Sequence, residues 1–167
     1  METISAEKKV LEISDEELFR DYSEMVYRLS LARVSERAAA EDILQEVFLR
    51  AIKNRPTFDS REHAKAWLIK ATINCSKSYL SSAYRRHYAP LEDRVAEVIS
   101  EDHRDLMMAV WALEPKYKTV VHLYYFEDMK IEEIKEALGI SASAAKQRLK
   151  RARTMLKDLM TGDETDV

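Results

Sequence analysis

Basic and amide side chains gather in one segment near the C-terminal end of the sequence. Between Ser141 and Lys157 six residues are basic and none is acidic, although the whole chain of 167 residues has a net charge of −3. Arg and Gln can pair with guanine and adenine edges, whereas Lys mainly supplies charge to phosphates. The pattern predicts a nucleic-acid contact made by Ser143, Lys146, Gln147, Arg148, Lys150 and Arg151. From charge alone, a basic helix face that meets only solvent is the alternative.

The residues before this segment predict how it is presented. Ile131, Ile134 and Leu138 recur at helical spacing and form an apolar stripe on a short helix. Gly139 stands where that helix must end in a left-handed residue, and Ser141 can cap the next helix. A helix, a glycine turn and a capped second helix are typical of the DNA-binding helix-turn-helix, whose second helix enters the major groove. A plain helical hairpin is the alternative.

Catalytic and metal-binding patterns are absent from the sequence. The histidines do not follow the spacing of metal ligands, and no glycine-rich loop is present to cradle a phosphate. The lone Cys75 excludes a disulfide framework and a cysteine-based zinc site, and no activating partner is evident beside it. We therefore expect no metal, no other cofactor and no enzymatic activity of the chain itself.

The composition predicts that helices position the basic segment. Only 2 Gly and 3 Pro occur, whereas sheets and active-site loops use Gly where φ is positive. Apolar residues make up 46% of the chain and charged residues 34%, which suits a packed core under a charged surface. The predicted fold class is all-α. No apolar run approaches the ~20 residues of a membrane span, and no signal peptide is evident, so we expect a cytoplasmic protein without membrane insertion.

Apolar spacing and capping signals predict three helices in the first half of the chain. Ser14 and Glu17 have the pattern of a capping box at the start of the first helix. A second helix is expected over residues 36–53, because Pro56 disfavours helix at the residue before it. A third should follow the loop 57–60. The residues of the second helix that we expect to face inward are Ile43, Val47 and Ala51, with Leu44, Phe48 and Ile52 beside them.

Helical periodicity fails between residues 83 and 101, which we interpret as a flexible linker. The chain then divides into a block of three to four helices, residues 10–82, and a helix-turn-helix block, residues 102–160. Pro115 suits the first turn of a helix that precedes the helix-turn-helix. The expected architecture is thus two small helical domains.

Several motifs recur in a recognisable order along the chain. Residues 40–51 (AEDILQEVFLRA) form an amphipathic segment, and Phe58-Asp59, residues 66–68 and Asn74 follow it. Residues 113–127 precede the predicted helix-turn-helix. Together these segments resemble bacterial sigma factors of the extracytoplasmic-function group, which are small two-domain specificity subunits of RNA polymerase.

The resemblance implies that the basic helix recognises the minus-thirty-five promoter element. It also implies two further binding sites. The core-polymerase-binding residues would be Asp42, Gln45, Glu46 and Leu49. The residues that bind the minus-ten element would be Phe58, Asp59, Ser60, Arg61, Lys65, Lys70, Asn74 and Lys77. An Asn side chain offers both a donor and an acceptor, which suits a base edge.

The implied partners are core RNA polymerase and promoter DNA, and an inhibitory anti-sigma factor is common in the family. The predicted function is promoter recognition, promoter opening and initiation of transcription. One alternative is a helix-turn-helix regulator whose N-terminal block senses a ligand or dimerises. Another is a helical adaptor whose basic helix binds an acidic partner. Binding to core polymerase separates the sigma factor from the regulator, and DNA binding separates both from the adaptor.

Two lysines depart from the usual helix-turn-helix pattern. Lys130 stands where a Ser or Thr cap is common, and Lys135 occupies a turn-facing position that usually holds a small residue. We expect the aliphatic stem of Lys135 to pack while its ammonium group reaches water. Trp67 is open to two interpretations, a wedge beside DNA or a core residue.

Overall fold

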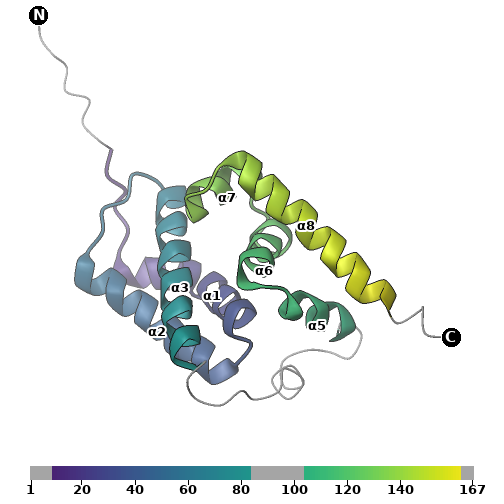
Figure 1. Cartoon of the computed structure of the whole chain (residues 1–167). Coiled ribbons are helices and arrows are strands. Elements are labelled where there is room, and N and C mark those ends of the chain that lie inside the picture. The colour runs from purple at the N-terminus through teal and green to yellow at the C-terminus, as the bar shows by residue number, and fades with distance from the viewer. Residues whose placement is uncertain (1–8, 84–103, 163–167) are drawn as a thin grey trace, which may run out of the picture.

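The computed structural model describes residues 9–83 and 104–162, in which every regular element is helical (Figure 1). The N-terminal block consists of α1 (Asp15–Val34), α2 (Arg37–Asn54) and α3 (Arg61–Ala83). The C-terminal block consists of α5 (Arg104–Ala112), α6 (Pro115–Val121), the π-helical turn η2 (His122–Phe126), α7 (Ile131–Leu138) and α8 (Ala142–Thr161). The all-α prediction is confirmed. The predicted linker lies, except for residue 83, outside the described residues.

The capping box predicted at the start of α1 is present. The Ser14 hydroxyl accepts a hydrogen bond from the Glu17 amide at 3.1 Å, and the Glu17 carboxylate accepts one from the Ser14 amide at 2.9 Å. The hydrogen bond from the Ser14 amide, together with interaction with the Ser14 hydroxyl, holds the pKa of Glu17 below its ordinary value. The helix ends at Ser35, whose φ of 54° lies in the left-handed region. The start of α1 is therefore set by local sequence.

The core of the N-terminal block lies where α1, α2 and α3 meet. Val26 and Leu29 of α1, Val47 of α2 and Leu68 and Ile69 of α3 are fully buried. The expected inward residues Ile43, Val47, Ala51 and Phe48 are indeed buried, and Leu44 is half-buried. The prediction for Ile52 is wrong, because its side chain is 45% exposed. It follows Ala51 by one residue and is rotated by about 100° around the helix away from the core.

The C-terminal block has a core of its own. Pro115 occupies the first turn of α6, as its missing amide allows. Val120 is fully buried, and the aromatic rings of Trp111 and Tyr117 lie beside it. Leu149 and Ala152 cover this core from α8, which orients the helix.

The two blocks pack against each other. Contacts join α3 to α7 and α1 to α6, and Figure 1 shows α7 beside the upper end of α3. Ile134 and Ala137 of α7 belong to the same buried cluster as the core of the N-terminal block. The described residues thus form one packed body with two cores. No helix of the described residues is long and apolar enough to cross a membrane.

Candidate nucleic-acid interface

The turn between α7 and α8 sets the direction of the basic helix. Gly139 has a φ of 63°, which a residue without Cβ adopts at little cost, and its amide donates to the Lys135 carbonyl. The Ser141 hydroxyl accepts a hydrogen bond from the Ala144 amide at 3.0 Å and caps α8. The predicted glycine turn and serine cap are both confirmed.

The two unusual lysines fit this geometry without disturbing it. Lys130 supplies no side-chain cap, but its amide donates to the Glu133 carboxylate at 2.7 Å, so one free backbone donor is still satisfied. Lys135 is half-buried, and its ammonium group lies 3.5 Å from the Glu132 carboxylate. Its stem packs while its charge stays near the surface, as expected for a long amphipathic side chain.

One face of α8 carries most of the predicted minus-thirty-five residues. Their spacing of three or four residues places them in a single stripe along the helix. They line an open groove of about 900 Å³, which also includes Tyr117, Thr154 and Asp158. All members of the stripe are exposed: Ser143, Lys146, Gln147, Lys150 and Arg151. Three cations and one amide on the face of a capped helix suit contacts with phosphates and base edges.

Two arginines of α8 point elsewhere. Arg148 is half-buried and lines the cleft between the blocks, on another side of the helix from the exposed stripe. Arg153 donates a hydrogen bond to the Tyr125 hydroxyl at 2.6 Å and lies over the Tyr124 and Tyr125 rings. The structure therefore brings five of the six predicted residues together and separates Arg148 from them.

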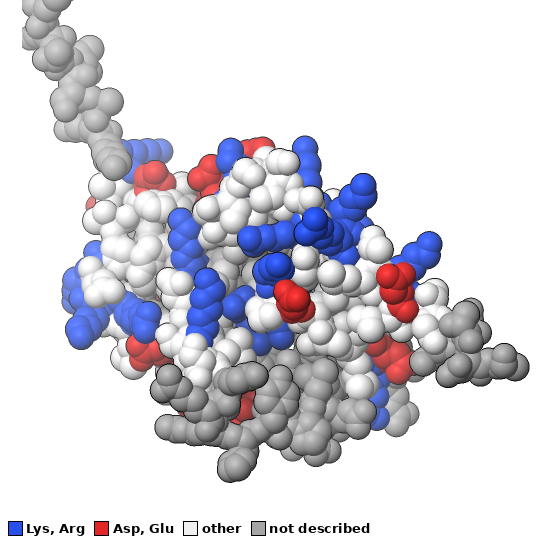
Figure 2. All heavy atoms as spheres, viewed as in Figure 1, with Lys and Arg blue, Asp and Glu red and all other residues white. Residues whose placement is uncertain are grey.

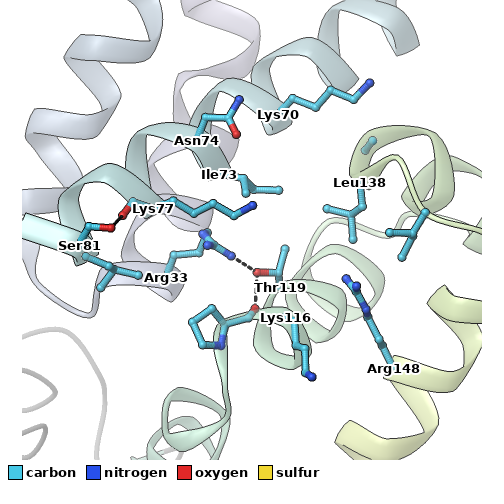
Figure 3. Close-up of a pocket in the computed structure, with 14 residues that line it drawn as sticks. Arg33, Lys70, Ile73, Asn74, Lys77, Ser81, Lys116, Thr119, Leu138 and Arg148 are labelled. Atoms are coloured by element: carbon cyan, nitrogen blue, oxygen red, sulfur yellow. Dashed lines mark hydrogen bonds between the residues drawn. The ribbon is translucent and has the colours of Figure 1, made fainter. Parts of the chain in front are cut away.

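The predicted minus-ten residues of α3 divide between two locations. Lys70, Asn74 and Lys77 are exposed, follow one another at helical spacing, and line the cleft that faces the C-terminal block (Figure 3). Figure 2 shows Lys and Arg side chains gathered along this face of the molecule. Lys65 is half-buried and does not line the cleft. Asn74 is thus placed among cations, as a base-reading amide would be.

The loop before α3 is tied to the N-terminal block by its own contacts. The Ser60 hydroxyl accepts from the His63 amide at 3.1 Å and caps α3. The Arg61 guanidinium lies 2.8 Å from the Asp21 carboxylate, which raises the pKa of Arg61 above its ordinary value. Asp59 is exposed beside them. Ser60 and Arg61 therefore already have partners before any strand binds.

Phe58 does not fit its predicted role. Its ring is only 4% exposed and packs edge-on against His63 and Trp67. The ring is therefore part of the core in this structure and is not presented on the surface for a direct contact with DNA. Trp67 is half-buried in the same cluster, which favours its interpretation as a packing residue.

The outer face of α2 presents all four residues predicted to bind core polymerase. Asp42, Gln45, Glu46 and Leu49 are exposed, and Leu49 is 60% exposed. Glu46 accepts a hydrogen bond from Arg50 at 2.9 Å, one turn further along the helix. An exposed apolar side chain among carboxylates and an amide suits docking against a basic partner.

This face has an apolar extension that the sequence did not predict. Phe19 of α1 is 48% exposed and packs edge-on against Phe48 of α2, with ring centroids 4.9 Å apart. Together with Ile52 they line a groove of about 330 Å³ between the two helices. The signal in the sequence was ambiguous, because Phe19 and Ile52 look like ordinary core residues when only their type is known.

Metal ligands and a reactive thiol are not found among the described residues. No group of His, Cys, Asp and Glu in residues 9–83 and 104–162 could hold a metal ion. Cys75 is buried, and burial raises the pKa of its thiol above the ordinary value.

Known proteins show the same organisation. The Sigma-70 region 2 family matches residues 18–86, and the Sigma-70 region 4 family matches residues 103–156. RNA polymerase sigma factor SigV of Bacillus subtilis (strain 168) is 31% identical over 150 residues, which cover 86% of this chain and 89% of SigV. The ECF RNA polymerase sigma factor SigW of the same strain is 26% identical over 172 residues, covering 89% of this chain and 92% of SigW. The protein belongs to the extracytoplasmic-function group of RNA polymerase sigma factors.

A solved sigma factor has the same fold. The sigma factor RpoE of Bartonella quintana, crystallised in complex with the anti-sigma factor NepR, matches 91% of this chain and 98% of its own with a TM-score of 0.70 and 20% identity. This sigma factor therefore has the two-domain architecture that its sequence predicts. As a member of the family it binds core RNA polymerase and promoter DNA and directs the initiation of transcription. The regulator and adaptor alternatives no longer apply.

Proposed function

We propose that this sigma factor reads a promoter with two separate surfaces and binds core polymerase with a third. The exposed stripe of α8, from Ser143 to Arg151, contacts the duplex of the minus-thirty-five element. The observation that carries this assignment is the unbroken polar and basic face on a helix that a glycine turn and a serine cap hold at the surface. Lys146, Lys150 and Arg151 supply charge, and Gln147 supplies a paired donor and acceptor.

The stripe of Lys70, Asn74 and Lys77 on α3 contacts the minus-ten element after the duplex opens. Removing a base from the stack costs a few kcal/mol, which stacking and hydrogen bonds to the base edge offset. Asn74 is exposed between two lysines, so its amide can meet a base while the lysines hold the phosphates. Asp59, Ser60 and Arg61 at the start of α3, with Lys65 one turn further along, extend this contact beyond the cleft, and Phe58 supports the loop from the core.

The outer face of α2 binds core polymerase. Asp42, Gln45, Glu46 and Leu49 combine charge with an apolar anchor, which suits a basic partner helix. The family resemblance implies a coiled coil of the largest polymerase subunit as that partner. The groove beside Phe19 and Ile52 lies next to this face and extends its apolar area.

Several finer assignments belong to the same proposal. The domains extend over residues 10–82 and 102–160, the sigma factor acts in the cytoplasm beside polymerase, and it is not itself an enzyme. An anti-sigma factor inhibits it, which is supported by the fold that it shares with a sigma factor solved in such a complex.

In-vitro transcription with core polymerase on a promoter library tests the proposal. The full-length protein should select one pair of promoter elements, and Lys146→Gln with Lys150→Gln should weaken transcription from every selected promoter. A matched control, Arg37→Gln with Lys130→Gln, removes two exposed charges that lie outside the three surfaces. Equal loss with the control pair would show that total charge, and not the α8 stripe, determines promoter use.

A further inference from the structure

The promoter contacts explain only one wall of a basic cleft between the two helical blocks, the wall that α3 provides. Its volume is about 920 Å³, and its walls come from both blocks. No Asp or Glu of the described residues lines it. Its cationic residues are Arg33 of α1, Lys70 and Lys77 of α3, Lys116 of α6 and Arg148 of α8. In Figure 3, Lys77 and Arg148 point toward the cleft from opposite walls.

The positive charge of this cleft is poorly compensated. Arg33 is 4% exposed, and its guanidinium donates hydrogen bonds to the hydroxyls of Ser76 and Thr119 but makes no ion pair with a described carboxylate. Burial lowers its pKa to about 10. Lys70, Lys77 and Arg148 likewise make no ion pair within residues 9–83 and 104–162, and only Lys116 lies near an acid, 3.7 Å from Glu114. Like charges on facing walls repel each other and disfavour the packed arrangement.

We propose that the cleft binds a small anion with several phosphate groups, either an inorganic polyphosphate or a nucleoside polyphosphate. Phosphate oxygens form strong charge-assisted hydrogen bonds with Arg and Lys, and a cleft of this volume accommodates such a molecule. Because the walls belong to different blocks, the anion binds only while the blocks are packed together. It therefore stabilises that arrangement by mass action.

This binding also bears on promoter use, a step that rests on the proposed function. The names of the minus-ten and minus-thirty-five elements give their positions on the promoter, which are about 25 base pairs apart. At about 3.4 Å per base pair this separation is roughly 85 Å of duplex. A compact protein of this length has a radius of gyration of only about 15 Å. The blocks must therefore separate to bind both elements, and an anion that holds them together opposes promoter binding. It also occupies the cleft that Asn74 lines.

Calorimetry with inorganic tripolyphosphate on the full-length protein tests the proposal. We expect one site per chain, and roughly tenfold or more weaker binding in Arg148→Gln and in Lys116→Gln. Arg151→Gln is the matched control, since it removes the same charge from the same helix outside the cleft. Equal affinities in Arg148→Gln, Arg151→Gln and the unmodified protein would overturn the proposal, as would the absence of binding. A parallel titration with ATP distinguishes a nucleotide source from an inorganic one.

Energy transfer between dyes on the two blocks gives an independent readout. Arg20→Cys on α1 and Lys157→Cys on α8, in a Cys75→Ala background, provide exposed labelling positions. In the labelled protein with an unchanged cleft, tripolyphosphate should increase the fraction of molecules whose two blocks are packed together. In the labelled protein that also carries Arg148→Gln, it should not. Binding without this increase, or binding of a single-stranded oligonucleotide alone, would contradict the proposal and leave the promoter assignments intact. Conversely, failure of the promoter assignments would not change the calorimetric result.

Discussion

Arg33 of α1 donates a hydrogen bond to the Thr119 hydroxyl of α6, across 86 positions of sequence. The same guanidinium donates to Ser76 of α3, so one buried side chain joins three helices of both blocks. Each hydroxyl also donates to a backbone carbonyl in its own helix, Thr119 to Pro115 and Ser76 to Ile73. The arginine therefore adds a link between hydroxyls that already have partners.

From this geometry we expect the volume of the Arg33 side chain to matter more for stability than its charge. Arg33→Ala should lower the free energy of unfolding by about 2–4 kcal/mol, because it leaves a cavity. Arg33→Met should cost less than about 1.5 kcal/mol, because the apolar chain fills the space and no buried charge remains. Urea unfolding of the two variants measures the difference. Equal losses would mean that the hydrogen bonds, and not the packing of the stem, stabilise the interface.

Glu127 provides a second link between the blocks, and it should depend on pH. Its carboxylate accepts hydrogen bonds from Arg28 of α1 at 3.1 Å and 3.3 Å and lies 3.1 Å from the His122 ring. Burial acts to raise the pKa of Glu127, but the bonds from His122 and Arg28 outweigh it and hold the pKa below its ordinary value of 4.5. A carboxyl group whose pKa is lower in the folded state than in the unfolded state stabilises the fold at pH values above its unfolded-state pKa. This stabilisation is lost as the pH falls through its folded-state pKa.

We therefore expect Glu127→Gln to lower the free energy of unfolding by about 1–3 kcal/mol at pH 7. The difference from the unmodified protein should persist down to about pH 5 and shrink progressively below pH 4.5. Urea titrations at a series of pH values measure it. Glu24→Gln is the control, since that carboxylate is exposed and pairs with the same Arg28 at 3.4 Å. A difference that stays constant with falling pH would contradict the role of the charge.

Local signals account for what the sequence predicted well. The Ser14–Glu17 capping box, Gly139 and Ser141 act within a few residues, so their residue types decide the backbone directly. The exposed stripe of α8 follows from helical spacing once the inward face, with Ala145 and Leu149, is known.

Long-range contacts account for what the sequence did not predict. The burial of Phe58 and the turn of Arg148 toward α3 depend on elements far away along the chain. The same holds for the bond between Arg33 and Thr119, since nothing in the types of these residues names the partner. The exposure of Ile52 depends on one step of helix rotation, which apolar character alone does not determine.

The face of α2 can be tested by charge reversal. Asp42→Lys with Glu46→Lys should weaken binding to core polymerase by about 2 kcal/mol or more, if these carboxylates meet basic partners at the interface. Both are exposed, so the free energy of unfolding should change by less than ~1 kcal/mol, including the lost surface pair of Glu46 and Arg50. Competition for core against a labelled sigma factor measures the effect. Glu24→Lys on α1 with Glu136→Lys on α7 is the control, because both carboxylates are exposed and lie outside this face and its groove, and an equal loss there would argue against the assigned face.

Single-strand recognition by α3 predicts a separation of two steps. Asn74→Ala should impair promoter opening by polymerase while leaving binding of the upstream duplex unchanged, because Asn74 lies outside the α8 stripe. A fluorescent base in the minus-ten element reports opening. Ser78→Ala is the control one turn further along α3. Ser78 is exposed, and its hydroxyl donates only to the backbone carbonyl of Asn74. Normal opening with reduced duplex binding in Asn74→Ala would reverse the assigned roles.

The α8 stripe predicts different effects for its amide and its cations. Gln147→Ala should cost ~1–3 kcal/mol on the preferred sequence and relax preference at one base pair, as expected for a residue that reads a base edge. Arg151→Ala should weaken all sequences alike and lower the salt dependence by about one phosphate contact. Both residues are exposed and lie in the same groove, so neither substitution should alter the fold.

Duplex binding by the polymerase holoenzyme, measured on minus-thirty-five variants at several salt concentrations, separates these two effects. The full-length protein is the right material, because Ile134 and Ala137 of the helix-turn-helix pack against the core of the N-terminal block. Arg153→Ala is the control, since that guanidinium is already held by the Tyr125 hydroxyl and should contribute little to DNA contact. If Arg153→Ala matched Arg151→Ala in salt dependence while Gln147→Ala had no effect on preference, the DNA-facing side of α8 would have to be reassigned.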